Sequence, residues 1–575
     1  MNERQGKIRL IASAAFLLLA MVGLGARLAF LHLGPHDGIR KRVQDNQRFE
    51  ETIAPGRGNI FDCKGEGNIL AVNLPVKDVC ADPAEIVKSS KVPDVAVQLS
   101  EILELPAGEI VVKLSNPSRR FACVRRFVGD EQAEAVCQRK LPGVFLRETT
   151  LRHYPNKSTM CHVLGFVNYD GQGSAGIEMS LDKHLRGSPG LLDSRVNALG
   201  QELYWQREKY LPAVAGASVC LTLDQNVQYI VEKALDSVME EHNAKAAWAI
   251  VQRVRTGEIL AMASRPGYDL NKFPTADRDS MLNRAIGSVY EPGSTFKAVV
   301  IAAALNEKVV ATDTVFDCEN GSWMYNKRVL RDYHPYGSLT VADGIKKSSN
   351  ILTAKVALRL GDRQVYQYLR AFGIGGKMGI DLPGEEAGIL HAVSKWSNIS
   401  VTRVAIGQGV AVTALQMLGV FCAIANDGYL MRPYVVSSVV GSTGSVIYRG
   451  NPEVMSRPVS FETAATMRRL LSRVTEEGGT GIRAQVDGYE VAGKTGSAQK
   501  PVAGGYSTTA YMASFVGFLP AEDPEIGLIV VVDEPQPLHT GGVVAGPVFS
   551  KIASETVRYL DVPSSKSGQL ANTDR

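Results

Sequence analysis

The sequence has no excess of charge of either sign, since 63 lysines and arginines face 59 aspartates and glutamates, a net charge of +4. It also has no long run of basic residues. Proteins that bind nucleic acid gather lysine and arginine on one face to contact phosphates. We therefore expect no nucleic-acid partner. A hydrophobic fraction of 45% over 575 residues instead indicates a globular protein of about two to four domains.

The common metal-binding spacings are missing as well. No Cys-x-x-Cys occurs among the eight cysteines, and no His-Glu-x-x-His occurs among the nine histidines. His32 and His36 are four residues apart, but a Gly-Pro pair separates them, so they are not expected to share one helix face. The sequence therefore predicts neither a metal nor a cofactor.

A second long apolar run is also absent, and the one that is present lies at the N-terminus. Leu10–Ala26 contains 17 residues without a charge, and the mostly apolar Leu28–Leu33 follows Arg27. The small residues near its end would also fit a cleaved signal peptide. We favour a retained anchor, because the apolar stretch continues past Arg27, which can snorkel to the interface. Residues 1–34 are thus predicted to form a cytoplasmic tail and one transmembrane helix.

The basic residues before this run predict the orientation of the chain. Arg4, Lys7 and Arg9 would stay on the cytoplasmic side, so everything after about residue 35 would be exported. We expect a single-pass protein of the inner (cytoplasmic) membrane with its exported part on the periplasmic side. The eight cysteines would then lie in an oxidising compartment, where some can pair, but the sequence does not say which.

The most informative stretch of the sequence surrounds Ser294. Pro292 and Gly293 break the preceding structure, and the apolar, alanine-rich run after them predicts a buried helix. Ser294 would lie near the N-terminus of that helix, and Lys297 one turn later on the same face. A serine hydroxyl is a weak nucleophile until a base takes its proton, and a buried lysine with a lowered pKa can do so.

Alone, this pattern is weak. Ser180 with Lys183 and Ser497 with Lys500 show the same spacing, and an isolated match is most often a helix start with a solvated lysine. Ser180 and Lys183 fall on what looks like the solvated face of a helix, so we do not take them as an active site.

Two further short patterns follow in the same half of the chain. Ser348-Ser349-Asn350 comes after a helical segment, and Lys494-Thr495-Gly496-Ser497 lies on a predicted strand. Each has an ordinary alternative, a helix cap for the first and a strand-end turn for the second. Ser-x-x-Lys, Ser-x-Asn and Lys-Thr-Gly in this order within one domain are, however, typical of serine acyl-transferases that react with penicillin.

Composition also predicts how the exported part is organised. Linker-like residues at Leu211–Ser218 indicate a boundary between an elongated, mixed α/β pedestal domain, 35–215, and a second domain, 216–562. The order of elements in the second domain indicates an antiparallel sheet packed between helices, so the fold class is α+β multidomain. The polar tail 563–575 is expected to be disordered. The clearest expected helices are Val92–Leu103, Ala175–Gly187, Gln225–Glu240 and Leu339–Lys347, and the clearest strands His162–Val167, Val219–Asp224, Ala246–Val254, Ile259–Ser264, Val491–Gln499, Ala510–Phe518 and Ile526–Val532.

With these motifs in view, the chain resembles the class B penicillin-binding proteins, the membrane-anchored peptidoglycan D,D-transpeptidases. The likeness covers nearly everything from Arg57 to about Tyr559, and the anchor and length look most like the division-specific subgroup. The stretches that carry it beyond the three catalytic motifs are Arg57–Asp62, Arg152 with Tyr154 and Pro155, His162–Val167, Gly176–Gly187, Met262–Asn271, Asn283–Ala285, Asp381–Glu385, Gly407–Gly409 with Thr413 and Gln416, and Gly478–Gly481.

The resemblance implies roles for the motif residues. Ser294 would attack the carbonyl between two D-alanines of a stem peptide and release D-Ala, with Lys297 as the base. Ser348 would relay the proton to the leaving amine, and Asn350 would help hold Lys297 and the substrate amide. Lys494 would add positive potential, Thr495 and Ser497 would bind the terminal carboxylate beside Gly496, and the backbone N–H groups of Ser294 and Ser497 would form the oxyanion hole.

The resemblance also implies the partners, which would be stem peptides ending in D-Ala-D-Ala, β-lactam antibiotics, a membrane glycosyltransferase and other division proteins. Two positions depart from the family pattern. Cys63 stands where the family usually has arginine, which concerns the pedestal, and Ser497 stands where it usually has threonine. A hydroxyl is kept at residue 497, so the chemistry is not in doubt, but the fit of substrate or drug can differ.

Other functions stay open at this point. The transpeptidase could serve elongation and not septal wall synthesis. A β-lactam-hydrolysing relative of the class A type would carry a Glu-x-x-Leu-Asn stretch between the second and third motifs, and none is found. A sensor would need a signalling domain inside the cell, where only a few residues lie, and a scaffold would not need four intact motif side chains. The acceptor amine, diaminopimelate or lysine, is not readable from the sequence.

Overall fold

The computed structural model describes residues 2–34, 38, 47–197 and 202–565, with side chains from residue 4 onward. It divides into two compact units, which are residues 1–55 with 188–214, and residues 56–187 with 215–575. The domain limits 34/35, 215/216 and 562/563 remain predictions. The expected disorder of the tail concerns residues that, from 566 on, lie outside the described part of the chain.

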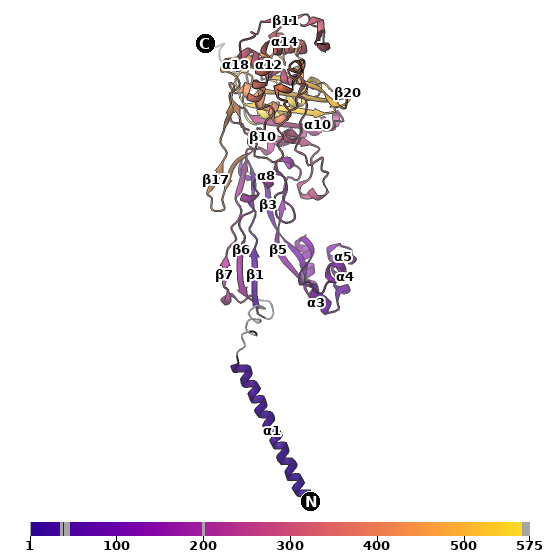
Figure 1. The fold of residues 1–575 in the computed structure, drawn as a ribbon, viewed down its shortest axis with the longest axis vertical. Coiled ribbons are helices and arrows are strands. Elements are labelled where there is room, and N and C mark those ends of the chain that lie inside the picture. Colours follow the sequence, from indigo (N-terminus) through magenta and orange to yellow (C-terminus); the bar gives the residue numbers. More distant parts are fainter. Residues whose placement is uncertain (1, 35–37, 39–46, 198–201, 566–575) are drawn as a thin grey trace. The chain divides into compact units, whose positions relative to one another are not determined.

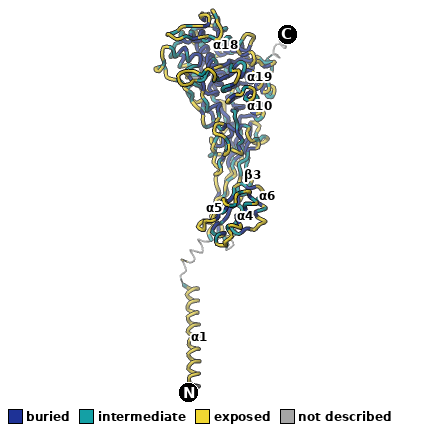
Figure 2. Tube along the Cα trace, turned by 90° about the vertical axis from the view of Figure 1, so that its right-hand side faces the viewer, coloured by how far each residue is buried: buried dark blue, intermediate teal, exposed yellow. Residues whose placement is uncertain are grey.

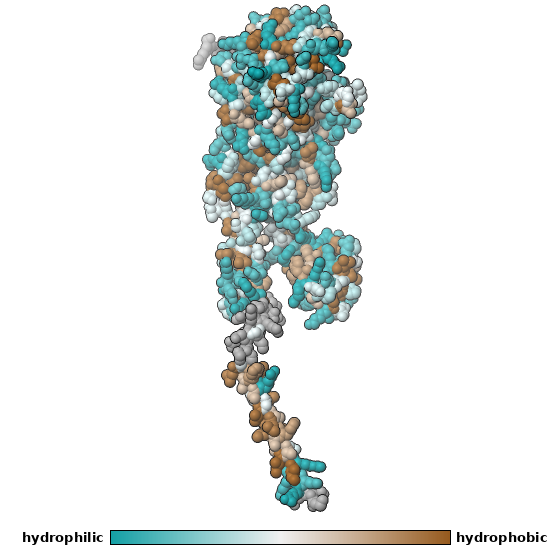
Figure 3. All heavy atoms as spheres, viewed as in Figure 1, coloured by the Kyte–Doolittle hydropathy of each residue, from teal (hydrophilic) through white to brown (hydrophobic). Residues whose placement is uncertain are grey.

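The first unit contains the N-terminal helix and a small sheet (Figure 1). Helix α1 (Asn2–Leu33) includes a 30-residue stretch, Arg4–Leu33, with a hydropathy of 2.1, long and apolar enough to cross a membrane. Among the described residues it is the one helix that meets this test. Figure 3 shows its apolar side chains along the helix surface. The antiparallel sheet has the order β1 (Arg48–Ile53), β6 (Gly190–Arg195), β7 (Lys209–Leu211).

In the second unit, a seven-stranded sheet joins segments from both halves of the sequence. Strand β2 (Ile60–Asp62) pairs in parallel with β8 (Ser218–Leu221), and β8 pairs with β16 (Val436–Val440). Both β4 and β5 pair with the long β3. The remaining strands of this sheet are β3 (Gly65–Ala81), β4 (Ala122–Val128), β5 (Val144–His153) and β17 (Val446–Arg449).

Four helices pack on one end of β3, β4 and β5 and enclose a small core of their own. Buried members of that core include Val79, Leu99 and Val124. Helix α4 spans Val92–Leu103, as predicted, and buries Val95, Ala96, Leu99 and Leu103. The other helices are α3 (Pro83–Lys88), α5 (Ala107–Leu114) and α6 (Asp130–Arg139).

Two sequence-based predictions between residues 162 and 187 are wrong. Residues expected as a strand, His162–Val167, begin with a helical turn, α7 (Cys161–Leu164). All four residues of that turn are buried, and a short apolar run does not distinguish a buried strand from a buried helical turn. The single helix expected over Ala175–Gly187 is two short ones, α8 (Gly176–Ser180) and α9 (Asp182–Leu185), interrupted at Leu181. Ser180 and Lys183 are exposed, as expected.

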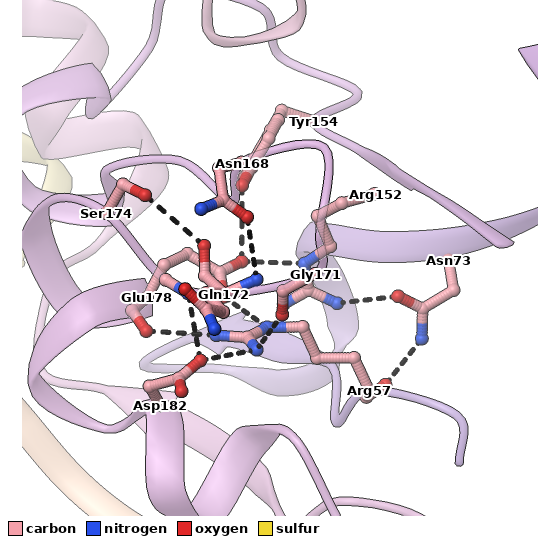
Figure 4. A network of polar contacts seen from close by, with 11 residues as sticks. Arg57, Asn73, Arg152, Tyr154, Asn168, Gly171, Gln172, Ser174, Glu178 and Asp182 are labelled. Atoms are coloured by element: carbon pink, nitrogen blue, oxygen red, sulfur yellow. Dashed lines mark hydrogen bonds and ion pairs between the residues drawn. The ribbon is translucent and has the colours of Figure 1, made fainter. Parts of the chain in front are cut away.

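A buried network of charges holds these turns to the strands (Figure 4). Glu178 has a fully buried side chain, and its carboxylate accepts from Arg57 Nε at 2.7 Å and from Arg152 Nε at 2.6 Å. Arg57 also pairs with Asp182 at 2.7 Å, and the Tyr154 hydroxyl lies 3.3 Å from Glu178. A buried carboxylate needs such partners. Residues from three separate motifs of the sequence therefore meet in one place.

The other sheet of this unit is a five-stranded antiparallel sheet, with the order β10, β9, β21, β20, β19. Residues alternate between its two faces, so Ile250 and Ile529 belong to one core while Ala249 and Val530 belong to the other. Figure 2 shows this region as largely buried. The strands are β9 (Ala246–Arg253), β10 (Ile259–Arg265), β19 (Ala492–Val502), β20 (Gly505–Leu519) and β21 (Ile526–Asp533).

Helices cover both faces of this sheet, which confirms the predicted antiparallel sheet between helices. One face packs against α10 (Gln225–Glu241) and α19 (Gly541–Tyr559). The other faces the core that contains α12 (Lys297–Asn306), in which eight of ten residues are buried, and α17 (Ala414–Ala425). The predicted helix Gln225–Glu240 and the predicted hairpin of Ala246–Val254 with Ile259–Ser264 are confirmed.

A further element of the first unit is the 3-10 turn η1 (Tyr204–Gln206). In the second unit, α12 contacts η3 (Gly293–Phe296), α13 (Val341–Lys346), α14 (Asn350–Leu360), α15 (Asp362–Ala371) and α18 (Phe461–Ser472). The other elements described in this unit are α11 (Arg284–Gly287), α16 (Ser400–Val404), the 3-10 turns η2 (Leu270–Thr275), η4 (Glu319–Gly321), η5 (Val393–Lys395) and η6 (Ile482–Ala484), and the short strands β11 (Val315–Asp317), β12 (Ser322–Tyr325), β13 (Arg328–Arg331), β14 (Ser338–Thr340), β15 (Leu430–Met431) and β18 (Val454–Ser456).

Candidate active site

Ser294 lies in the 3-10 turn η3, which leads directly into α12. The serine is half-buried, whereas Thr295, Phe296 and Lys297 are buried. Gly293 has a φ of +57°, and an added Cβ there would lie 3.2 Å from the Cβ of Ala498 on β19. The chain therefore turns sharply beside β19 immediately before the serine, a position that favours glycine. The structure thus places Ser294 at a helix start, as predicted, next to the strand that carries Lys494.

Lys297 follows one turn later and is fully buried. Its Nζ donates to the backbone carbonyl of Ser348 at 2.5 Å and to Ser348 Oγ at 3.1 Å. Burial lowers the pKa of Lys297 from 10.5 to about 7, and the negative charge of Asp332 opposes part of this change. Near neutral pH a large share of this amine is therefore unprotonated and can accept a proton.

Ser348 connects α13 to α14 in a left-handed conformation, with a φ of +60°. Its hydroxyl oxygen lies 2.9 Å from Lys494 Nζ as well as 3.1 Å from Lys297 Nζ. A serine oxygen has two lone pairs, so it can accept from both amines and still donate its own hydrogen. That hydrogen is then available to a third group in the site.

Lys494 reaches Ser348 from β19 and is also fully buried. The pKa of Lys494 lies well below the usual lysine value, mainly because the side chain is buried. The nearby positive charge of Lys297 lowers this pKa further. Lys494 Nζ also lies 3.3 Å from the carbonyl oxygen of Thr495. Two buried amines that share one hydroxyl disfavour each other's protonation, so a single proton shared by the pair costs less than two.

The structure places Asn350 differently from the other motif residues. Its side-chain Nδ2 donates to the carbonyl of Arg331 at 2.7 Å, so this amide is directed to β13. The neighbouring Ser349 is the N-cap of α14, with its Oγ accepting from the N–H of Leu352 at 3.0 Å. The helix-cap alternative considered for this motif therefore applies to its middle serine and not to Ser348.

The end of the third motif contacts the start of α19. Ser497 is exposed, and its Oγ accepts from the N–H of Gly541 at 2.8 Å. Thr495 Oγ1 lies 3.0 Å from Thr480 Oγ1. An added Cβ at Gly541 would lie 2.2 Å from the carbonyl oxygen of Gly496, so α19 can approach β19 this closely only with glycine at that position. The two hydroxyls of residues 495 and 497 thus lie on the strand that passes Ser294.

Asp332 was not identified from the sequence, yet its carboxylate holds the start of α14. Oδ2 accepts from Ser349 Oγ at 2.7 Å, and Oδ1 accepts from the backbone N–H groups of Asn350 at 2.5 Å and Ile351 at 3.1 Å. No motif spacing identifies this aspartate. In the sequence it is an acidic residue that follows a short hairpin, 16 positions before Ser348. Acidic residues after hairpins are so frequent in soluble domains that this position alone does not indicate a functional role.

A cavity of about 530 Å³ lies beside the motif residues. Its lining includes Glu291, three residues before Ser294, and Gln499 and Lys500, two and three residues after Ser497. Burial raises the pKa of Glu291, whose Oε1 accepts from the N–H of Gly409 at 2.8 Å. Both segments that bring motif residues together therefore continue into the walls of one cavity.

Two family models match the chain. Residues 247–554 match the penicillin binding protein transpeptidase domain, and residues 52–221 match the penicillin-binding protein dimerisation domain. Among curated relatives, a probable peptidoglycan D,D-transpeptidase PenA of Neisseria meningitidis is 33% identical over 98% of this chain and 94% of its own length. The peptidoglycan D,D-transpeptidase FtsI of Escherichia coli is 31% identical over 95% of this chain and 91% of its own.

Solved structures agree with this similarity. A peptidoglycan synthetase from Bifidobacterium adolescentis superposes with a TM-score of 0.73 at 26% identity, covering 90% of this chain and 98% of that one. Penicillin binding protein 3 of Mycobacterium tuberculosis, in complex with aztreonam, gives a TM-score of 0.69 at 28% identity, with the same two coverages.

Proposed function

The chain belongs to the class B penicillin-binding proteins, the peptidoglycan D,D-transpeptidases, and on this premise we propose that it cross-links stem peptides through an acyl-enzyme on Ser294. The observation that carries the proposal is the placement of two buried amines, Lys297 and Lys494, on the single hydroxyl of Ser348, beside the turn that holds Ser294.

In the first step, Ser294 Oγ attacks the carbonyl between the two terminal D-alanines while Lys297 takes its proton. The bond between the carbonyl and the terminal D-alanine then breaks. The D-Ala leaves as a free amino acid, and its amine receives a proton through Ser348. Lys297 suits this role because its pKa of about 7 leaves it partly neutral at physiological pH. Positioned proton transfer of this kind typically contributes about 10²–10⁴ in rate.

The carbonyl oxygen and the terminal carboxylate of the substrate need partners of their own. We assign the oxyanion hole to the backbone N–H groups of Ser294 and Ser497, where one donor is typically worth about 10²–10³ in rate. The hydroxyls of Thr495 and Ser497, next to Gly496, bind the carboxylate, and Lys494 supplies positive potential. Because Ser497 accepts from Gly541, its own hydrogen is free to donate to the carboxylate. Asn350 would have to leave Arg331 to contact the substrate amide.

In the second step, the amine of another stem peptide attacks the acyl-enzyme and forms the cross-link. Ser348 and Lys297 then transfer protons in the reverse direction. A β-lactam presents a carboxylate and an acyl group in the same relation, so it acylates Ser294 but leaves no site for the acceptor.

We assign this reaction to septal wall synthesis, with the catalytic part on the periplasmic side of the inner membrane. The resemblance to the division-specific subgroup supports the septal role, and the basic residues in the first turns of α1 support the periplasmic placement. The partners would include a membrane glycosyltransferase and other division proteins. Depletion from cells distinguishes the two wall-synthesis roles, since a septal enzyme is expected to yield filaments and an elongation enzyme round cells.

The chemistry is tested by exposing the full chain in detergent to benzylpenicillin and measuring the intact mass. A stable adduct is expected on the parent and on Ser180→Ala, which removes the serine of an exposed Ser-x-x-Lys pair, but not on Ser294→Ala. Rapid loss of free penicillin without an adduct would instead indicate a hydrolase. If the parent shows neither an adduct nor any turnover of penicillin, the mechanism proposed here is excluded and a scaffold role is favoured.

A further inference from the structure

A cluster of exposed aromatic side chains lies in the first unit, where the chain passes from β6 to β7. Trp205 is 78% exposed, Tyr204 71% and Tyr210 53%. The other three tryptophans of the chain are buried or half-buried. A single exposed apolar side chain is ordinary, but several large ones gathered in one place indicate a surface that contacts something other than water.

Arg207 joins the two tyrosines of this cluster. Its guanidinium carbon lies 5.5 Å from the ring centre of Tyr204 and 5.1 Å from that of Tyr210. The same guanidinium donates to both carboxylate oxygens of Glu202, at 3.0 and 3.1 Å. The rings are thus arranged around a cation that already has its counter-charge. We call Tyr204, Trp205, Arg207 and Tyr210 the aromatic patch.

The patch carries no net charge. Residues 202–211 contain two acidic and two basic side chains. Besides the pair that Arg207 makes, Glu208 accepts from Arg195 Nη2 at 2.9 Å, and Lys209 is exposed at the start of β7. A neutral, aromatic surface fits a partner that is itself amphipathic and does not fit a partner recognised mainly by charge.

The patch lies at the end of the sheet where the chain arrives from α1. The N–H of Val196, the residue after β6, donates to the carbonyl of Gln47, the residue before β1, at 2.8 Å. The chain then returns and pairs antiparallel with β6 as β7, with Lys209 opposite Asp193. The segment that carries the patch therefore lies at the same end of the sheet as the start of β1.

The length of the connection limits how far this end of the sheet can be from the membrane. Fourteen residues, 34–47, separate the last residue of α1 from the first residue of β1. A chain of that length spans at most roughly 50 Å. The patch is therefore confined to the neighbourhood of the surface at which α1 ends. Tyrosine and tryptophan concentrate at such surfaces, because the ring prefers hydrocarbon and its polar group prefers the hydrated headgroups.

We propose that the aromatic patch is a membrane contact, in which the rings of Tyr204 and Trp205 lie in the headgroup region of the bilayer that α1 spans. The contact is with uncharged lipid, since the patch has no net charge, and its strength follows the aromatic area that is buried. The first unit then has two attachments to the membrane, α1 and the patch. The proposal depends on α1 as a membrane span and is independent of the reaction at Ser294.

The test uses the full chain, labelled with 5-fluorotryptophan, in nanodiscs of phosphatidylcholine. One ¹⁹F resonance is expected for each tryptophan, and that of Trp205 is identified by its loss in Trp205→Phe. Phosphatidylcholine with a spin label at the headgroup should broaden the Trp205 resonance. The Trp323 resonance, identified by its loss in Trp323→Phe, is the internal control, because Trp323 stacks on Tyr325 in the second unit and should keep its width.

A variant of the tyrosines tests whether the patch acts as a whole. Tyr204→Ser combined with Tyr210→Ser should reduce the lipid-dependent broadening of Trp205 by roughly twofold or more, because two of the three rings are lost. Both tyrosines are exposed, so the fold should be kept. Tyr229→Ser is the matched control, because it removes an equally exposed tyrosine from α10 and should leave the broadening unchanged.

A Trp205 resonance that keeps its width beside the spin-labelled lipid would overturn the proposal. If a soluble gadolinium chelate also fails to broaden it, the patch is covered by protein, and a dependence on the number of chains per nanodisc would identify a second copy as the occupant. Broadening that requires anionic lipid would overturn the proposal as well, since charge and not aromatic area would then carry the contact.

Discussion

Lys297 and Lys494 reach the same oxygen atom, since Ser348 Oγ lies 3.1 Å from one Nζ and 2.9 Å from the other. Both lysines are fully buried. An arrangement of two amines and one hydroxyl can hold one proton with little penalty and two only at a cost. This arrangement therefore suits the proton transfer that the proposed mechanism requires of Lys297 and Ser348.

The pH dependence of acylation follows from this arrangement. In the proposed mechanism Lys297 must be neutral to take the Ser294 proton, and its pKa of about 7 means that the neutral form dominates above that pH. The rate of acylation by benzylpenicillin is expected to fall about tenfold per pH unit below the pKa and to level off above it. Stopped-flow or quenched mass measurements check this. An acid limb near the usual lysine value would contradict the assignment of Lys297 as the base.

Removing the shared hydroxyl should affect chemistry more than stability. Ser348→Ala is expected to lower the acylation rate by about 10²–10⁴, because both amines lose their common acceptor and the proton relay is broken. Thr340→Ala is the matched control. Thr340 caps α13 through the N–H of Asp343, so its loss should cost about 1 kcal/mol of stability and leave acylation near the parent rate. Equal acylation rates in the two variants would argue against the relay.

Glu178 is expected to be essential for the stability of the motif network in the first half of the chain. Glu178→Ala leaves Arg57 and Arg152 buried without their carboxylate, which should cost about 3–5 kcal/mol. The exposed Glu148 provides the control, and Glu148→Ala should be nearly neutral. Thermal unfolding of the full chain, followed by limited proteolysis of the same region, measures both. Equal melting temperatures of the two variants would show that the network contributes little to the stability of the fold.

The contact between α19 and β19 requires glycine at residue 541. Gly541→Ala would bring a Cβ within 2.2 Å of the carbonyl oxygen of Gly496, so the helix must move away from the strand and from Ser497. We expect a loss of about 1–3 kcal/mol and slower acylation. Gly108→Ala, in α5 with no atom within 4 Å of the added Cβ, should be neutral or slightly stabilising. A normal acylation rate in Gly541→Ala would show that the Ser497 contact is dispensable.

Among the eight cysteines, the structure places Cys80 and Cys123 directly opposite each other on β3 and β4. Opposite residues of antiparallel strands have Cα atoms within the range that a disulfide spans. Burial raises the pKa of Cys80 to about 12, so its thiol should react slowly until the strands open. Mild oxidation with oxidised glutathione is expected to link this pair, as judged by peptide mapping, with Cys80→Ser as the control. Alkylation of both thiols after oxidation would contradict this.

Much of the site could be predicted from the sequence, because motif spacing reports local geometry. Ser294 and Lys297 are one turn apart on a continuous element, and the strand with Lys494 has a clear apolar pattern. The predicted strands β9, β10, β20 and β21 were found for the same reason. What spacing could not predict is contact between distant segments. Asp332 reaches α14 across a hairpin, and Asn350 donates to Arg331, which no local pattern indicates.

The wrong assignments have a related cause. His162–Val167 is a short apolar run, and its strand or helical form depends on the buried neighbours and not on its own periodicity. The interruption at Leu181 is likewise set by tertiary contacts, since Arg57 binds both Glu178 before it and Asp182 after it.

The parallel pairing of β2 with β8 has a consequence for anyone who divides this protein into parts. Cutting the chain near residue 215 would leave the sheet-forming edge of β8, with its buried Val219 and Leu221, exposed to water on one fragment and the matching edge of β2 on the other. Unpaired apolar edges of this kind bind one another without regard to the correct partner. The two halves are therefore expected to be soluble when they are expressed as one chain and to aggregate when they are expressed separately. The domain boundary predicted at 215/216 is for this reason a poor position at which to truncate the protein.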